Sequence, residues 1–89
     1  MKEYNLEGQK MTSKARAHEH IAHRLEMPES FGRNLDGLWD FLSHIRTNTI
    51  INFTDTDAVV ENLGQYGEDL IKTFTDAAAG NKKIVLDIE

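Results

Sequence analysis

Cysteine is absent from this chain of 89 residues, and proline occurs only once, at Pro28. A chain without cysteine forms no disulfide bonds, on which many small secreted domains depend, so the absence favours a reducing compartment. The first residues carry no apolar core of a signal peptide, and no segment approaches the ~20 apolar residues of a membrane span. We therefore expect a cytoplasmic protein with no membrane partner.

Positive charge is also scarce: the chain has 10 lysines and arginines but 15 aspartates and glutamates, which gives a formal net charge of −5 at pH 7. An acidic domain repels nucleic acid and attracts basic proteins over about one Debye length, ~8 Å in physiological salt. Lys82 and Lys83 form the only adjacent basic pair, so we expect no nucleic-acid partner. The balance favours a cationic protein partner, although such a charge also serves solubility alone.

The length suits a single domain over residues 1–89 with one hydrophobic core. Apolar alternation predicts three strands, near residues 4–6, 49–53 and 84–88. Capping residues and apolar spacings of three and four predict about four helices, at residues 13–25 and 34–45 and two more between 54 and 80. Strands separated by helices predict an α/β fold: a three-stranded parallel sheet with about four packed helices.

Two of these helices carry more detailed expectations. The first is capped by Thr12 or Ser13, and its apolar face is predicted to contain Ala15, His18, Ile21, Ala22 and Leu25, with His18 partly buried. The third is predicted to open with a capping box formed by residues 54–57, Thr-Asp-Thr-Asp.

The helix that follows Asn34 has two distinct faces. Its core-facing side is predicted to contain Leu35, Leu38, Phe41, Leu42 and Ile45. The solvent side is predicted to contain Asp36, Asp40 and Ser43, with Trp39 at the edge between the two faces.

Two features of the sequence of this helix lower its stability. Asp36 and Asp40 are like charges one turn apart, which costs roughly 0.2–0.5 kcal/mol. Gly37 costs up to ~1 kcal/mol relative to alanine. Costs without an internal gain often mark a functional site. The alternative is an ordinary acidic surface, in which Gly37 allows another part of the backbone to approach closely.

The segment from Leu25 to Leu42, LEMPESFGRNLDGLWDFL, resembles the signature of the barstar family. That signature has a leucine, two residues and a proline, then a glycine before an asparagine, followed by Leu-Asp-Ala-Leu-Trp-Asp. Length, acidity, the first strand and the strand over residues 84–88 also fit, so the resemblance spans nearly the whole chain. It implies a three-stranded parallel sheet with packed helices, and a cytoplasmic inhibitor that protects a microbial cell from its own secreted ribonuclease.

The resemblance also implies which residues meet the partner. Asp40 would take the place of a substrate phosphate, and Asp36 would pair with a nearby basic side chain. Asp76 stands at the position of a family glutamate that also contacts the enzyme. The remaining contacts implied on the helix are Asn34, Leu35 and Trp39.

The chain departs from the family pattern at several positions near this surface. Ser30 replaces a tyrosine that stacks on the partner, and Ser43 replaces a threonine. His44 and Ile45 replace a Gly-Trp pair, and Arg33 replaces an acidic residue. We keep Ser30, Ser43 and His44 among the expected partner-binding residues.

These observations predict an intracellular inhibitor of a basic microbial ribonuclease of the barnase type. Because such an enzyme holds phosphate with cationic side chains, carboxylates fixed on a helix can occupy its site with little loss of conformational entropy. We expect no catalytic residues, no metal site and no cofactor, and a monomer when the chain is free. An antitoxin or regulatory binding module for a different basic protein remains the alternative.

Other functions fit the residues less well. Acid–base catalysis by Asp36 and Asp40 requires a cleft and one carboxyl kept protonated, whereas both project from an exposed helix. His20 and His23 could reach one metal ion but have no evident further ligand. A calcium loop after Asp55 would lack its glycine and its closing glutamate.

Overall fold

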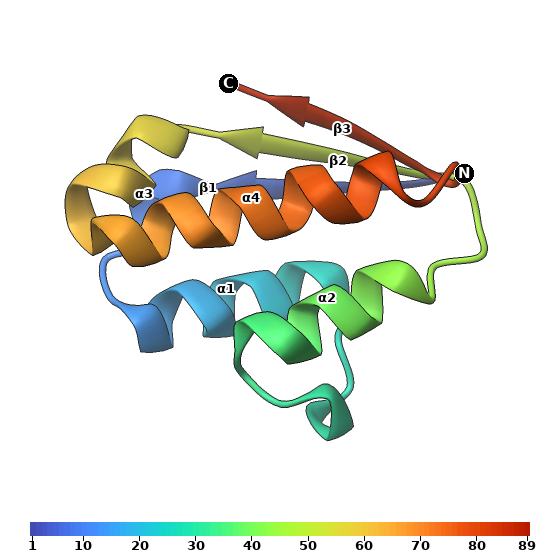
Figure 1. Ribbon diagram of the computed structural model, residues 1–89, viewed down its shortest axis with the longest axis horizontal. Coiled ribbons are helices and arrows are strands. Elements are labelled where there is room, and N and C mark those ends of the chain that lie inside the picture. The colour runs from blue at the N-terminus through green and yellow to red at the C-terminus, as the bar shows by residue number, and fades with distance from the viewer.

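A computed structural model describes residues 1–89 (Figure 1). Its elements in chain order are β1 (Lys2–Glu7), η1 (Gly8–Lys10), α1 (Lys14–Leu25), η2 (Glu29–Phe31), α2 (Leu35–Ser43), β2 (Thr49–Thr54), α3 (Thr56–Leu63), α4 (Gln65–Ala79) and β3 (Ile84–Ile88). The predicted three strands and four α-helices are confirmed. The two short 3₁₀ helices, η1 and η2, were not predicted. No helix has both the length and the apolar character needed to span a bilayer.

The three strands form one parallel sheet in the order β1-β2-β3. Tyr4 pairs with Ile51, and Ile51 pairs with Leu86. Both crossovers step in the same direction across the sheet, so the right-handed rule predicts all helices on one face. Figure 1 shows α1, α2 and α4 on the same side of the sheet. The parallel α/β fold predicted from the sequence is therefore confirmed.

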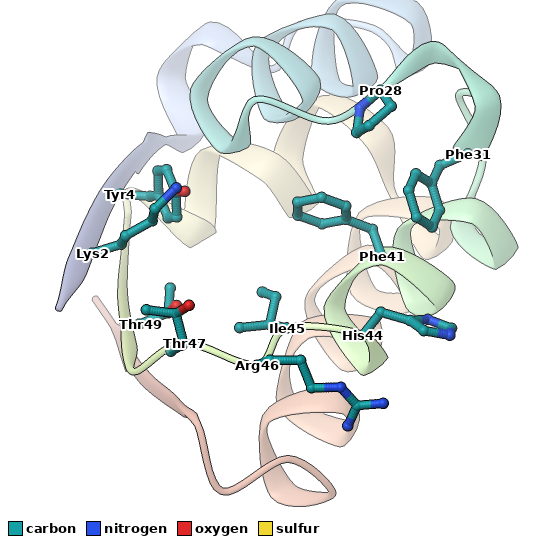
Figure 2. A pocket seen from close by; sticks show the side chains of 10 residues that line it. All are labelled: Lys2, Tyr4, Pro28, Phe31, Phe41, His44, Ile45, Arg46, Thr47 and Thr49. Atoms are coloured by element: carbon teal, nitrogen blue, oxygen red, sulfur yellow. The ribbon is translucent and has the colours of Figure 1, made fainter.

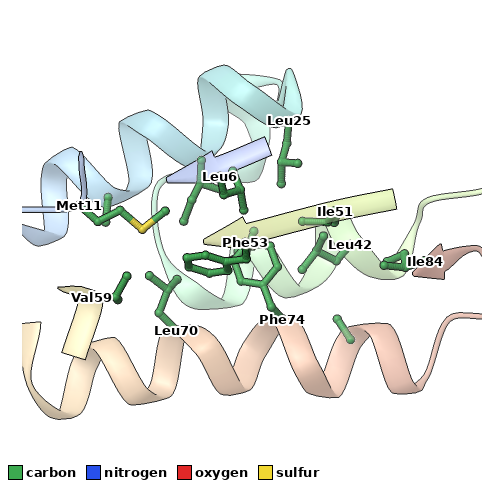
Figure 3. Close-up of a cluster of buried hydrophobic side chains, with 14 residues drawn as sticks. Leu6, Met11, Leu25, Leu42, Ile51, Phe53, Val59, Leu70, Phe74 and Ile84 are labelled. Atoms are coloured by element: carbon green, nitrogen blue, oxygen red, sulfur yellow. The ribbon is translucent and has the colours of Figure 1, made fainter. Parts of the chain in front are cut away.

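The hydrophobic core lies between this face of the sheet and the helices (Figure 3). Leu6, Ile51 and Phe53 point into it and are fully buried. Phe53 meets Phe74 of α4 in an edge-to-face arrangement with ring centroids 5.2 Å apart. α2 contributes Leu38 and Leu42, which are also buried, so packing fixes the orientation of that helix relative to the sheet.

Two local predictions were wrong. In α1 the buried alanines are Ala17 and Ala22, whereas Ala15 is exposed. Ala15 and Ala17 lie at opposite edges of the apolar stripe, and only the edge that contains Ala17 is buried. The capping box is absent, because Asp55 adopts a left-handed conformation (φ 55°) and its side chain caps nothing. Instead, the start of α3 is held by Thr56, which donates its N–H and its hydroxyl to the Glu89 carbonyl oxygen after β3.

Candidate protein-binding surface

The start of α2 is held by its N-cap and by the preceding loop. Asn34 is extended, and its Oδ1 accepts the Gly37 N–H at 2.7 Å, as predicted for a cap. The chain reaches Asn34 through Gly32, whose φ of 78° favours glycine. A Cβ on Gly37 would lie 1.8 Å from the Phe31 carbonyl oxygen, so only glycine allows the loop to lie this close to the first turn. The glycine therefore has a packing reason.

Asp36 and Asp40 lie on the solvent side of α2, opposite the buried Leu38 and Leu42. The structure contains three ion pairs, and neither carboxylate takes part in them. Trp39, between them in sequence, keeps 42% of its surface exposed. The ridge of α2 therefore presents two unpaired negative groups beside a half-exposed aromatic ring.

A depression of about 350 Å³ lies on the α4 flank of this ridge. Its lining comes from the two helices: Leu35, Asp36 and Trp39 from α2, with Asp69, Lys72, Thr73 and Asp76 from α4. The packing of α2 against α4 thus brings Asp76 to the same depression as Asp36. Asp69 and Lys72 were not predicted as site residues. Their spacing with Asp76, three and then four residues along α4, was the signal that could have found them.

The only cation of this depression is already paired. Lys72 Nζ lies 2.8 Å from Asp76 Oδ2, and both side chains are largely exposed. The hydrogen bond and the charge of Asp76 raise the pKa of Lys72 above its usual value, and Asp69 adds to the effect. Asp36 therefore remains unpaired here, while Asp76 is neutralised from within the protein.

The other predicted site residues are spread along the two ends of α2. Ser30 is exposed on η2, and Ser43 is exposed in the last turn of α2. The imidazole Nδ1 of His44 donates to the Asp40 carbonyl at 2.7 Å, which caps the end of the helix. None of these three lines the depression that contains Asp36 and Asp76.

His44 instead belongs to a groove of about 290 Å³ beside the end of α2 (Figure 2). Its apolar lining is Tyr4, Pro28, Phe31, Phe41 and Ile45, and Phe31 and Phe41 meet edge to face at 5.3 Å. Figure 2 shows Lys2, His44 and Arg46 at its edge. No carboxylate lines this groove. An acidic depression and a groove with basic residues at its edge therefore both adjoin α2.

Two of the three histidines in α1 make hydrogen bonds within the fold. His18, predicted to be partly buried, is buried, and its Nε2 lies 2.6 Å from the Tyr66 hydroxyl of α4. Burial lowers the pKa of His18, and the positive charge of Arg33 acts in the same direction. His20 Nε2 accepts the Glu7 N–H at 3.0 Å. No group of three or more His, Cys, Asp or Glu side chains is arranged to hold a metal ion.

The parallel sheet with helices on one face and the carboxylate-bearing helix define a small α/β fold with an acidic helical surface. A family model matches residues 1–89, the whole chain, and its description is Barstar (barnase inhibitor). The chain therefore belongs to the barstar family. No curated protein matches the chain.

Proposed function

We propose that this chain inhibits a basic ribonuclease of the barnase type by placing the carboxylates of α2 in the active site of the enzyme. The observation that supports this most is the family match over residues 1–89, because that family is described as a barnase inhibitor. The surface of α2 suits such a role, because Asp36 and Asp40 are exposed and free of ion pairs, on a helix whose first turn is capped.

Electrostatics explains why such a helix suits such a partner. A ribonuclease must hold a phosphate and stabilise developing negative charge, so its site collects cationic side chains. A carboxylate can form charge-assisted hydrogen bonds with those groups, and arginine can bind it through two nitrogens. Because Asp36 and Asp40 form no ion pairs in the free protein, binding breaks no internal ion pair of theirs. Opposite net charges also accelerate encounter, an effect that weakens with salt, and barnase–barstar is the standard measured example of such steering.

Apolar contacts supply the rest of the proposed interface. Trp39 and Leu35 line the depression between α2 and α4, where a half-buried aromatic ring can be covered by a partner. Large aromatic side chains near the centre of an interface often dominate binding energy. Asn34, Asp76, Ser30, Ser43 and His44 complete the proposed contact surface, around the central Asp36, Trp39 and Asp40.

The proposal carries consequences for the whole protein. The chain acts as one domain over residues 1–89, without catalytic residues, metal or cofactor, and as a monomer when free. Its partner is a basic ribonuclease rather than nucleic acid or a membrane. Its place of action is the cytoplasm, where it protects the producing cell from the enzyme.

A regulatory or antitoxin role toward a different basic protein is the second candidate. The groove with Lys2, His44 and Arg46 at its edge favours it, because the charges of Lys2 and Arg46 lie beside the end of α2 and would repel a uniformly basic enzyme. Ser30, at the exposed 3₁₀ turn before α2, also offers no aromatic ring to a partner. A partner with a local acidic patch would suit this end of the surface better.

Inhibition of RNA cleavage tests the proposal. Barnase is assayed on RNA with increasing amounts of the chain, then with Asp40→Asn and with Asp87→Asn, an equal charge change on β3. We expect activity to fall in one-to-one proportion with the wild-type chain and with Asp87→Asn. Asp40→Asn should weaken inhibition at least 100-fold, because a buried charge partner on the enzyme would be left unpaired. Full activity at excess wild-type chain would reject inhibition of barnase, and equal effects of the two variants would reject the role of Asp40.

A further inference from the structure

Lys72 is the only cation among the lining residues of the depression between α2 and α4. Three carboxylates line the same depression: Asp36, Asp69 and Asp76. Lys72 Nζ is held by Asp76 at 2.8 Å, and Asp69 lies three residues earlier on the same helix. The depression is therefore already occupied, at its α4 side, by a positive charge that belongs to the protein.

This pairing can open without disturbing the fold. Lys72 and Asp76 keep 72% and 51% of their side chains exposed, and they are neighbours one turn apart on a helix surface. Exposed pairs of this kind are weak, because water solvates both partners and salt screens them. The lysine can leave Asp76 while α4 stays packed on the core through the buried Leu70, Phe74 and Ala77.

We infer that Lys72 is a built-in competitor, which occupies in the free protein the place that a cationic side chain of the partner takes in the complex. The inference deepens the proposed function and depends on it for the kind of partner. Lys72 gives up its place at Asp76 Oδ2 when an external cation takes that position, and its charge repels that cation from a short distance. Lys72 therefore lowers affinity.

The competition also makes the surface selective. An external lysine would replace one ammonium group with another and would gain little. An external arginine offers a planar fork that can bind a carboxylate through two nitrogens, and its guanidinium stacks on aromatic faces such as that of Trp39. The residues around Lys72 therefore favour an arginine-bearing partner over a lysine-bearing one.

A peptide titration tests this without any ribonuclease. Trp39 is the single tryptophan of the chain and lines the depression, so its fluorescence reports occupancy. Hexa-arginine and hexa-lysine peptides are titrated into the wild type, Lys72→Met and Lys10→Met. Lys10→Met is the matched control, because Lys10 is also exposed and paired, with Glu7 at 3.5 Å, but lines a different depression.

We expect Lys72→Met to bind hexa-arginine about three-fold to ten-fold more tightly than the wild type, and Lys10→Met to stay within about two-fold. The wild type should prefer hexa-arginine to hexa-lysine, and Lys72→Met should bind both peptides more tightly. Equal gains in the two variants would overturn the inference, because only net charge would then matter. Absence of binding to both the wild type and Lys72→Met would overturn it as well.

The same variants in the barnase assay separate this inference from the proposed function. If the wild-type chain does not inhibit barnase while Lys72→Met still gains affinity for hexa-arginine, the partner is wrong and the role of Lys72 stands. If the chain inhibits barnase and Lys72→Met gains nothing in either assay, the proposed function stands and Lys72 is no competitor.

Discussion

Replacing Gly37 with alanine should destabilise this protein, although helix propensity alone predicts the opposite. Alanine is favoured over glycine in a helix interior by about 1 kcal/mol. At Gly37, however, a Cβ would lie 1.8 Å from the Phe31 carbonyl oxygen and 2.9 Å from its carbonyl carbon. The obstructing atoms belong to the backbone of η2, so a side-chain rotation cannot remove the contact.

The size of the effect follows from what must move. Insertion of a methyl group into a packed site typically costs about 1–3 kcal/mol. The required shift is on the order of 1 Å, and it also pulls on Asn34, whose cap contributes about 1 kcal/mol. After the gain in propensity is subtracted, we expect a net loss of about 1–2 kcal/mol in the free energy of unfolding. For a domain of this size that corresponds to a fall in Tm of about 5 to 15 °C.

Thermal and urea unfolding, followed by circular dichroism, measure this loss. Gly80→Ala is the matched control, because a Cβ on Gly80 meets nothing closer than 3.6 Å and its φ is −91°. The control should be neutral or stabilised by up to about 1 kcal/mol. If the Gly37→Ala variant is as stable as Gly80→Ala, the close approach of the η2 backbone is not the reason for glycine at position 37.

Two further outcomes follow from the same contacts. Asn34→Ala should lower the free energy of unfolding by about 1 kcal/mol, because it removes the cap of α2. Asn34→Ser should lower it much less, because serine can also cap the helix. Equal losses of the two variants in urea unfolding would contradict the role of Asn34 as the cap. Burial lowers the pKa of His18 below its usual 6.5, so on acidification the unfolded chain takes up a proton before the folded chain does. The contribution of neutral His18 to the free energy of unfolding is therefore fully present above about pH 6.5 and is lost as pH falls further. In the His18→Gln variant, the free energy of unfolding measured in urea should depend less steeply on pH between about pH 7.5 and 5.5. An unchanged slope would argue against titration of His18 in this range.

Much of the fold could be predicted because local patterns and tertiary packing agree. The alternation at Thr49, Ile51 and Phe53 matches one buried face of the sheet, and the spacing of Leu70, Phe74 and Ala77 matches one face of α4. The sequence pattern failed where two positions fit it about equally well and only tertiary packing determines which one is buried. Ala15 and Ala17 both adjoin the apolar stripe of α1, and only the arrangement of α1 on the sheet decides that Ala17 is buried.

The surface was predictable only in part for a similar reason. The exposure of Asp36 and Asp40 follows from their position opposite Leu38 and Leu42 on one helix. The pairing of Lys72 with Asp76, and the meeting of both with Asp36, depends on how α2 and α4 pack. At Gly37, the close approach of another part of the backbone was an alternative drawn from the sequence, and the structure shows it. That the approaching segment is η2 could not be predicted, because no local pattern reveals the path of the loop.

A crystal structure of the chain bound to barnase would test the central claim most directly. The account predicts that α2 lies in the active site of the enzyme, with the Asp40 carboxylate within hydrogen-bonding distance of the cationic side chains that hold the substrate phosphate. A complex in which α2 faces solvent, or in which Asp40 meets no cation of the enzyme, would contradict it.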